Sequence, residues 1–399
     1  MTLLNNPFVT SGYIAPEYFC DRERETEELL RWLVNENNVA IISTRRMGKT
    51  GLIQHCFHLK EIKENYYTFL IDIYATKTLR EFVFQLGKVI LATLKPKGRK
   101  AWELFVNSLV SLKAGFSLDM SGMPQWNLEL GDIKSPETTL DEIFHYLAVS
   151  DKPCIIAIDE FQQVAQYPEK NTEALLRTYV QHCDKAHFIF AGSQRHLMGE
   201  MFISPARPFY QSVSILHLSA IDKQKYMEFV QHHFRMAQKN IDITVFDSLY
   251  NRFEGITWYL QKILNILFAM TPKGEVCGGE MIEQAVDFIL DSYSFTYSEL
   301  LYQLPEYPSK DFLLLYRKSM SFQNQLCAIH NRIFPSSMPL GSTQLHESDM
   351  GEAKSDVLHP HPALYISQSF HALPESEEHF LQNQDNQIQN YSPDPPIHS

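Results

Sequence analysis

The sequence predicts an α/β protein with a parallel sheet, followed by a helical region and a tail of different composition. Up to about residue 217, short runs of β-branched and aromatic residues alternate with amphipathic stretches, which is typical of a parallel sheet with crossover helices. Several of those runs are apolar without alternation, as strands buried on both faces are. The strand pattern stops after residue 218, and neither pattern persists after residue 305. We therefore expect domains at 1–217, 218–305 and 306–399.

The first domain is expected to hold five strands separated by helices. The stretches Arg24–Asn35 and Leu79–Leu94 carry apolar residues at helical spacing. Residues 115–135 contain Gly, Ser, Met and Pro without any period, which predicts an inserted loop. The expected strands are 39–42, 68–73, 154–158, 188–191 and 213–216.

The second domain is expected to be helical, with Gly255 interrupting its pattern. The third region differs in composition, because from Ile333 onward it holds one base, Lys354, against nine acids, together with many Pro, Ser, His and Gln residues. Such a segment buries too little apolar surface to offset its chain entropy, so we expect the tail to be largely disordered. The expected helices of the second domain are 222–238, 245–253, 258–270 and 279–292.

Composition excludes several classes of protein. Of 399 residues, 44% are hydrophobic and 12% aromatic, which is too rich for wholesale disorder. The net charge of −12 argues against binding to nucleic acid or to an anionic membrane, although a local basic patch would still permit nucleic-acid binding. The first twenty residues lack a signal-peptide pattern and no apolar run is long enough to span a membrane, so we expect a cytoplasmic protein. The six cysteines show no Cys-x-x-Cys pair, which argues against structural zinc.

The strongest functional signal is the segment Ser43–Thr50, which follows the expected strand Val39–Ile42 and precedes a helix. A glycine-rich turn into a helix N-terminus presents backbone N–H groups to a phosphate. Lys49 is expected to reach the β- and γ-phosphates, and the hydroxyl of Thr50 to bind Mg²⁺. Ser43 replaces the first glycine of the usual Gly-x-x-x-x-Gly-Lys-[Ser/Thr] pattern, which weakens the match but not the expected binding. The residues expected around the nucleotide phosphates are Arg45, Arg46, Met47, Gly48, Lys49, Thr50 and Gly51.

A second signal lies about 110 residues later, where the apolar run Cys154–Ile158 ends in two acids. Asp159, at the strand tip, is expected to hold Mg²⁺ through water or Thr50. Glu160, one residue further, is placed to polarise an attacking water, which makes hydrolysis plausible. Solvated acids capping a buried strand are the plain alternative, and the phosphate-binding pattern upstream argues against it.

Two further positions are candidates for catalysis. The strand His187–Ala191 leads into Ser193 and Gln194, either of which can sense the γ-phosphate, although a plain turn remains the alternative. Arg207, after that strand, is a candidate transition-state arginine acting within the chain or on a neighbour. A surface arginine explains Arg207 equally well. Arg45 and Arg46 are expected to serve in positioning or at an interface.

Taken together, several separated motifs resemble the archaeal-type ATPases, in the signal-transducing (STAND) branch of the AAA-like P-loop NTPases. They correspond to the Walker A and Walker B motifs and their neighbours, in the expected order over residues 7–305, and the details resemble a Bacteroidetes subgroup. The motifs that carry the resemblance are Phe19–Glu23, Arg45–Thr50, Ile158–Gln163, Ala191–Gln194, Tyr167–Asn171 and Arg207–Ser212.

The resemblance implies a five-stranded P-loop NTPase core of the ASCE type, a helical lid and a C-terminal winged helix. It also places Tyr18, Phe19, Asp21 and Arg22 near the adenine. The lid of the family carries a Gly-x-Pro element that senses nucleotide, but here the matching segment, Gly255–Trp258, lacks the proline. After residue 305 the expected winged helix is replaced by the divergent tail, either because the module is absent or because the reading frame shifts near residues 307–320.

We therefore expect a switch ATPase that binds ATP and Mg²⁺ and turns over slowly. Its nucleotide state would set the angle between the sheet domain and the lid. A DNA-associated ATPase regulator or motor is one alternative, and a binding-only pseudo-ATPase that has lost its C-terminal module is another. ATP is the expected partner, and a second copy of the chain or another protein is a further candidate.

Overall fold

The computed structural model describes residues 6–94, 99–111, 116–118, 124–126 and 130–292. By its internal contacts the chain divides into two units, residues 1–277 and 278–399, and each is described by itself. The tail expected at 306–399 lies outside the described residues, as does the end of the expected helical domain after residue 292. The domain boundaries at 217 and 305 stay predictions.

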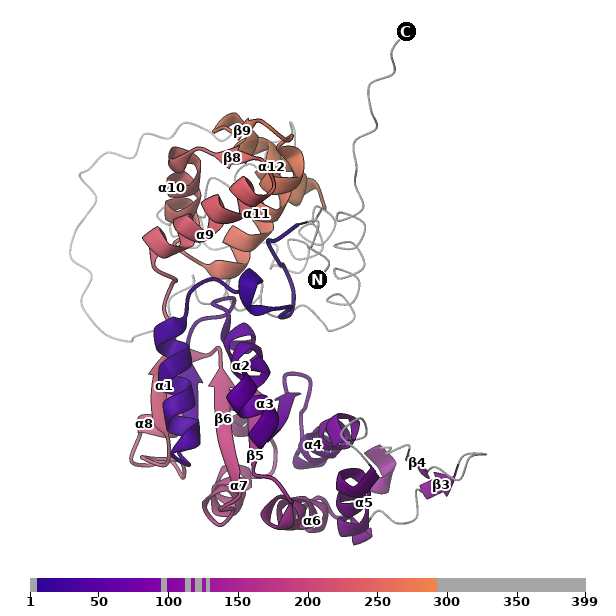
Figure 1. The fold of residues 1–399 in the computed structure, drawn as a ribbon. Helices are drawn as coiled ribbons and strands as arrows, with labels where there is room; N and C mark the ends of the chain where they lie inside the picture. Colours follow the sequence, from indigo (N-terminus) through magenta and orange to yellow (C-terminus); the bar gives the residue numbers. More distant parts are fainter. Residues whose placement is uncertain (1–5, 95–98, 112–115, 119–123, 127–129, 293–399) are drawn as a thin grey trace, which may run out of the picture. The chain divides into compact units, whose positions relative to one another are not determined.

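A five-stranded parallel sheet forms the centre of the first unit (Figure 1), which confirms the α/β prediction. The strands lie in the order β2-β5-β6-β1-β7, so β1 pairs with β6 on one side and β7 on the other. Every residue of β1, β5 and β6 is buried, as the unalternating apolar runs predict. The strands are β1 (Val39–Ile42), β2 (Tyr67–Asp72), β5 (Cys154–Asp159), β6 (Ala186–Gly192) and β7 (Ser214–His217).

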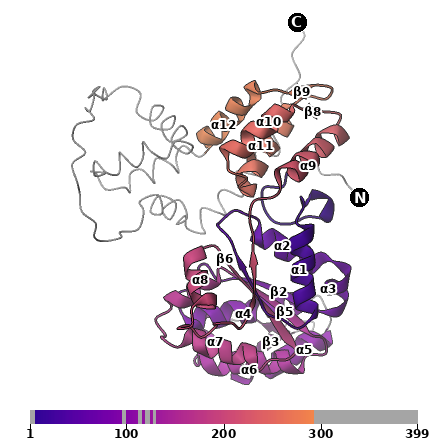
Figure 2. The same ribbon diagram turned by 90° about the vertical axis from the view of Figure 1, so that its left-hand side faces the viewer.

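Helices cover both faces of this sheet. Successive residues of a strand point to opposite faces, so each strand contributes side chains to the core on both sides. Val39 and Ile41 of β1 pack in one core cluster with residues of α1, α2 and α3. Ala40 and Ile42 pack in the other cluster, with residues of α4 to α8. Figures 1 and 2 show α1 and α2 side by side on one face. These helices are α1 (Glu23–Val34), α2 (Lys49–His58), α3 (Lys60–Asn65), α4 (Leu79–Leu94), α5 (Arg99–Ser108), α6 (Pro136–Val149), α7 (Thr172–Gln181) and α8 (Arg195–Ile203).

The segment expected to be an inserted loop, 115–135, contains two short strands. β3 (Phe116–Leu118) pairs antiparallel with β4 (Pro124–Trp126), and a 3₁₀ turn follows at Leu130–Asp132. Each strand has only three residues, so neither is long enough to show a readable alternation in the sequence. The prediction of a loop is corrected in this respect.

Helices follow β7, as predicted. The region also contains a pair of short strands that the sequence pattern does not reveal. In the first unit these helices are α9 (Lys223–Met236), α10 (Ile243–Arg252) and α11 (Thr257–Met270). The two-residue strands β8 (Asn240–Ile241) and β9 (Val276–Cys277) pair in parallel. In the second unit, α12 spans Glu280–Ser292.

The N-terminal segment is tied to these later helices. The ring of Phe8 is fully buried against Phe234 and Phe268, and the carbonyl of Phe8 accepts from Asn265 Nδ2 at 2.8 Å. Burying a large aromatic ring stabilises such contacts by roughly 1.5–3 kcal/mol. The start of the chain therefore contributes to the core of α9 and α11. Among the described residues, no helix is both long and apolar enough to cross a membrane.

Candidate nucleotide-binding site

The phosphate-binding loop (P-loop) joins the carboxyl end of β1 to the first turn of α2. Gly48 has φ +91° and stands as the N-cap of α2, a conformation that favours glycine because it has no Cβ. Ser43, in the place of the expected first glycine, is buried, and its N–H donates to the carbonyl of Gly192 at 3.4 Å. The serine is accommodated at this position because it has ordinary backbone geometry and a partner for its side chain, which donates to Thr44 O at 2.9 Å.

Lys49 is the last residue of this loop and the first of α2, and its ammonium group makes two long hydrogen bonds. Nζ is 3.4 Å from Ser43 Oγ and 3.3 Å from Thr44 O. Burial lowers the pKa of Lys49, and the nearby carboxylates of Glu160 and Asp159 offset part of that shift. A buried ammonium with weak local partners is suited to an anion that can supply stronger ones.

Asp159, at the end of β5, meets the loop through Thr50. The Thr50 hydroxyl donates to Asp159 Oδ2 at 2.5 Å, and the N–H of Glu160 donates to Asp159 Oδ1 at 3.0 Å. Burial raises the pKa of Asp159 above its usual range, and this outweighs the opposing effects of Thr50 and Lys49. A hydroxyl and a carboxylate that touch each other are the hard oxygen ligands that suit Mg²⁺. The structure thus brings together the two residues predicted to hold the metal.

Glu160 leaves the strand with φ +56° and lies between two donors. Ser193 Oγ donates to Glu160 Oε2 at 2.6 Å, and Gln162 Nε2 donates to the same oxygen at 2.5 Å. The structure thus brings Ser193 to Glu160, and the role of Ser193 as a sensor of the γ-phosphate stays a prediction. Gln162 was not predicted, although its place in the motif Ile158–Gln163 carried a signal. Its side chain is 1% exposed, and a Cβ on Gly192 would lie 2.5 Å from its Oε1.

Arg207 lies in a separate cluster. Its guanidinium pairs with Glu173 of α7 and, at 3.5 Å, with Glu200 of α8. Burial raises the pKa of Glu173, and the neighbouring Arg207 offsets part of that effect. In the described part of the chain Arg207 forms these pairs instead of joining Glu160, so its role as a transition-state arginine stays a prediction.

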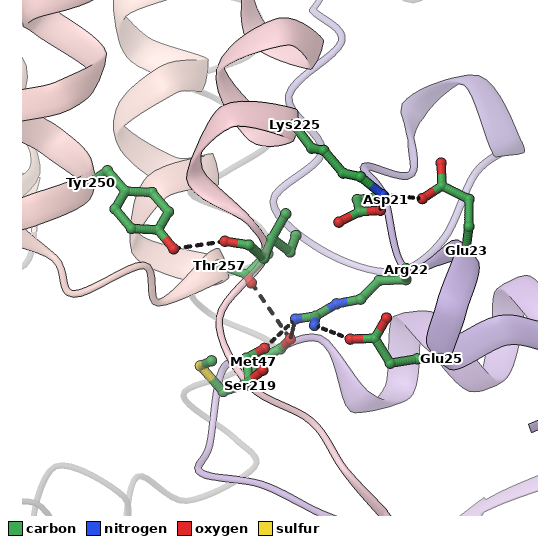
Figure 3. A network of polar contacts seen from close by, with 10 residues as sticks. Asp21, Arg22, Glu23, Glu25, Met47, Ser219, Lys225, Tyr250 and Thr257 are labelled. Atoms are coloured by element: carbon green, nitrogen blue, oxygen red, sulfur yellow. Dashed lines mark hydrogen bonds and ion pairs between the residues drawn. The ribbon is translucent and has the colours of Figure 1, made fainter. Parts of the chain in front are cut away.

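The residues expected near the adenine lie around the start of α1. The ring of Tyr18, at the end of the 3₁₀ turn η1 (Pro16–Tyr18), stacks on His233 of α9 with centroids 5.8 Å apart. Asp21 pairs with Lys225 of α9 at 2.9 Å (Figure 3). Phe19 lies against Gly51 of α2, since a Cβ on that glycine would be 3.6 Å from the Phe19 ring. Of these three residues, Phe19 lies beside the start of α2, whereas Tyr18 and Asp21 contact α9, and the contact of all of them with adenine stays a prediction.

Arg22 is buried, with 3% of its surface exposed, and its guanidinium connects three segments (Figure 3). Nη2 donates to the carbonyls of Met47 at 3.2 Å and Ser219 at 2.7 Å, and Nη1 pairs with Glu25 at 2.8 Å. Burial of a charged guanidinium is tolerated when hydrogen bonds of this kind satisfy it. Arg22 therefore holds the P-loop directly.

The two arginines inside the loop point to different parts of the molecule. Arg45 lies over the ring of Tyr74, 4.8 Å from its centroid. Arg46 lies over the ring of Trp258 in α11, 4.0 Å from its centroid. Their role in positioning or at an interface stays a prediction.

Residues 19–263, more than half of the chain, match the family model described as an ATPase domain predominantly from Archaea. None of the curated proteins matches. Among solved structures, the Walker-type ATPase PABY2304 of Pyrococcus abyssi matches with TM-score 0.53 and 19% identity, over 75% of this chain and 80% of that chain.

Another match is the ORC1 protein of Aeropyrum pernix, solved in complex with DNA, with TM-score 0.48 and 12% identity, over 73% of this chain and 70% of that chain. The match with the Pyrococcus abyssi ATPase, at 19% identity, shows a shared fold and nothing further. The family match covers the P-loop, the acids at the end of β5 and the first turns of α11 in one continuous span. The chain therefore belongs to the family of ATPase domains found predominantly in Archaea.

Proposed function

We propose that the protein binds Mg-ATP at the P-loop and hydrolyses it slowly, as a switch ATPase of the STAND and AAA-like class. The observation that carries this proposal is the contact between Thr50 and Asp159, with Lys49 buried beside them. Two residues from distant parts of the sequence meet there with the oxygen ligands that a nucleotide-bound Mg²⁺ requires.

Each residue then has a distinct task. The N–H groups at the start of α2 and the Lys49 ammonium bind the phosphate oxygens, where the helix dipole also favours negative charge. Thr50 and Asp159 hold the metal, which when bound neutralises charge on the phosphates. Glu160 polarises the attacking water and accepts its proton. Ser193 and Gln162 keep the Glu160 side chain oriented through Oε2.

The switch itself is proposed to be the position of the later helices relative to the P-loop. The pairs Lys225–Asp21 and Arg22–Ser219 both join the start of α1 to the segment after β7. Nucleotide binding at the loop is therefore expected to change how α9 and α11 are held.

We further propose that the protein is cytoplasmic and that its nucleotide state controls its binding to another protein or to a second copy of the chain.

Thermal unfolding with and without nucleotide tests the binding proposal. A ligand that binds only the folded state stabilises it by about 2.7 kcal/mol at a hundredfold excess over Kd. We expect Mg-ATP to raise the melting temperature of the parent chain, and Lys49→Ala to abolish the rise. Lys63→Ala, at an exposed lysine of α3, is the matched control and should keep the rise. An equal rise in Lys49→Ala would reject the proposed site.

A further inference from the structure

The first turn of α11 binds the backbone of the P-loop. The N–H of Trp258 donates to the carbonyl of Arg46 at 3.1 Å. The next carbonyl in the loop, that of Met47, accepts from Arg22 Nη2 at 3.2 Å and from the Thr257 hydroxyl at 3.5 Å (Figure 3). Two consecutive carbonyls of the loop are therefore held from outside it.

Side chains strengthen the same contact. The Arg46 guanidinium lies 4.0 Å from the centroid of the Trp258 ring and 5.2 Å from that of Tyr259. Its Nη1 also donates to the Tyr259 hydroxyl at 3.0 Å. Arg46 has φ +67°, a left-handed conformation that a residue with a Cβ adopts only when its surroundings hold it there. The contacts from α11 supply that support.

These carbonyl contacts determine where the phosphate-binding amides point. A peptide unit is planar and trans, so its C=O and N–H point in opposite directions. The carbonyl of Arg46 shares a peptide unit with the N–H of Met47, and the carbonyl of Met47 shares one with the N–H of Gly48. Fixing both carbonyls on the outside of the loop therefore fixes both N–H groups on its inside.

The start of α11 is itself anchored close to this point. Gly255, just before the helix, has φ +70°, and a Cβ there would lie 2.7 Å from the Cβ of Ala220. The Tyr250 hydroxyl donates to the carbonyl of Ile221 at 2.6 Å. Arg22 binds the carbonyl of Ser219 in the same connecting segment. The loop, the connector after β7 and α11 thus share one set of contacts.

We propose that Arg22, Thr257, Trp258 and Tyr259 form a brace that acts through Arg46 and Met47 and positions the amides of the P-loop for the nucleotide phosphates. The inference rests on the proposed function and adds its regulation: a displacement of α11 lowers nucleotide affinity, and nucleotide binding in turn holds α11 in place, because such coupling is reciprocal.

A double-mutant cycle on the full chain tests the brace. The dissociation constants of ATP and ADP are measured by calorimetry for the parent, Arg46→Ala, Trp258→Ala and the double variant. We expect each single change to weaken both nucleotides about tenfold, and the double variant to be no weaker than the weaker single one. Trp258→Phe keeps an aromatic ring for the Arg46 guanidinium, so it should retain most of the affinity that Trp258→Ala loses.

Lys239→Ala is the matched control. The Lys239 ammonium lies 4.3 Å from the centroid of the Phe268 ring, a contact comparable to that of Arg46 with Trp258. Its hydrogen bond goes to the carbonyl of Phe268 in α11 and not to the loop. Lys239→Ala should leave nucleotide affinity unchanged. If Trp258→Ala fails to fold, the cycle is run with Tyr259→Phe, which removes only the hydroxyl that Arg46 binds, and the same non-additivity is expected.

The possible outcomes separate the brace from the function on which it rests. Additive losses, an unchanged affinity in the Trp258 or Tyr259 variants, or an equal loss in Lys239→Ala would overturn the brace while leaving nucleotide binding in place. A parent chain that binds neither ATP nor ADP would overturn the proposed function, and the brace with it.

Discussion

The hydroxyl of Thr50 lies 2.5 Å from Oδ2 of Asp159, although 109 positions of sequence separate the two residues. The contact crosses the carboxyl edge of the sheet, because β6 lies between β1, which leads to Thr50, and β5, which ends at Asp159. The carboxyl ends of parallel strands converge at one edge, where ligands of open α/β folds bind.

Asp159→Asn should stabilise the nucleotide-free protein and abolish Mg²⁺-dependent ATP binding. Burial raises the pKa of Asp159 in the folded state, so an ionised Asp159 at neutral pH lowers the free energy of unfolding. Asparagine keeps one oxygen, which can accept from the N–H of Glu160 while its NH₂ group donates to the Thr50 hydroxyl, but it removes the charge. We expect a higher melting temperature without nucleotide and no further rise with Mg-ATP. A lower melting temperature would show that the charge is balanced in the folded protein.

Glu160→Gln should separate nucleotide binding from hydrolysis. Glutamine keeps an oxygen for Ser193 and Gln162 but cannot accept a proton from water. We expect the Kd for Mg-ATP to stay within a few-fold of the parent value and phosphate release to fall about 100-fold or more. Hydrolysis at the parental rate in the purified variant would remove Glu160 from the catalytic role.

Gly192→Ala should displace the residues that orient Glu160. The added Cβ would lie 2.5 Å from Gln162 Oε1 and 2.5 Å from Met198 Cγ, and both side chains are buried. We expect a loss of about 1–3 kcal/mol in unfolding free energy and slower hydrolysis. Gly199→Ala, in α8 with open space around it, is the control and should be neutral or slightly stabilising. Equal effects of the two changes would contradict this packing argument.

The free energy of unfolding should fall as the pH drops below about 6.5. Burial lowers the pKa of His55, His187 and His233 in the folded state, each from an unfolded value of 6.5. Below pH 6.5 the unfolded chain therefore binds more protons than the folded protein. The stability that is present above pH 6.5 is lost as the pH falls through the lower pKa values of the folded state. Denaturant titrations between pH 7.5 and pH 5 measure the slope, and His233→Gln should reduce it. A slope that His233→Gln leaves unchanged would show that this imidazole is accessible to protons in the folded state.

The core of the site could be predicted because its signals are local. The apolar runs of β1 and β5 indicate buried strands, and the residues directly after them are the loop and the two acids. Ser43 does not require a glycine backbone conformation, since the left-handed positions of the loop fall at Arg46 and Gly48. Gln162 was missed because a buried amide beside an acid has no periodicity that marks it.

The sequence by itself determined the parallel sheet, the P-loop and the family, because strand burial, helix spacing and a glycine-lysine-threonine turn are each encoded within a few neighbouring residues. Only the tertiary structure decided which partners the arginines take. Arg22 binds a carbonyl 197 positions away, Arg46 a hydroxyl 213 positions away, and Arg207 pairs with Glu173. A guanidinium satisfies any nearby acceptor or aromatic ring, so its partner depends on how the later helices fold back onto the loop, which no local pattern records.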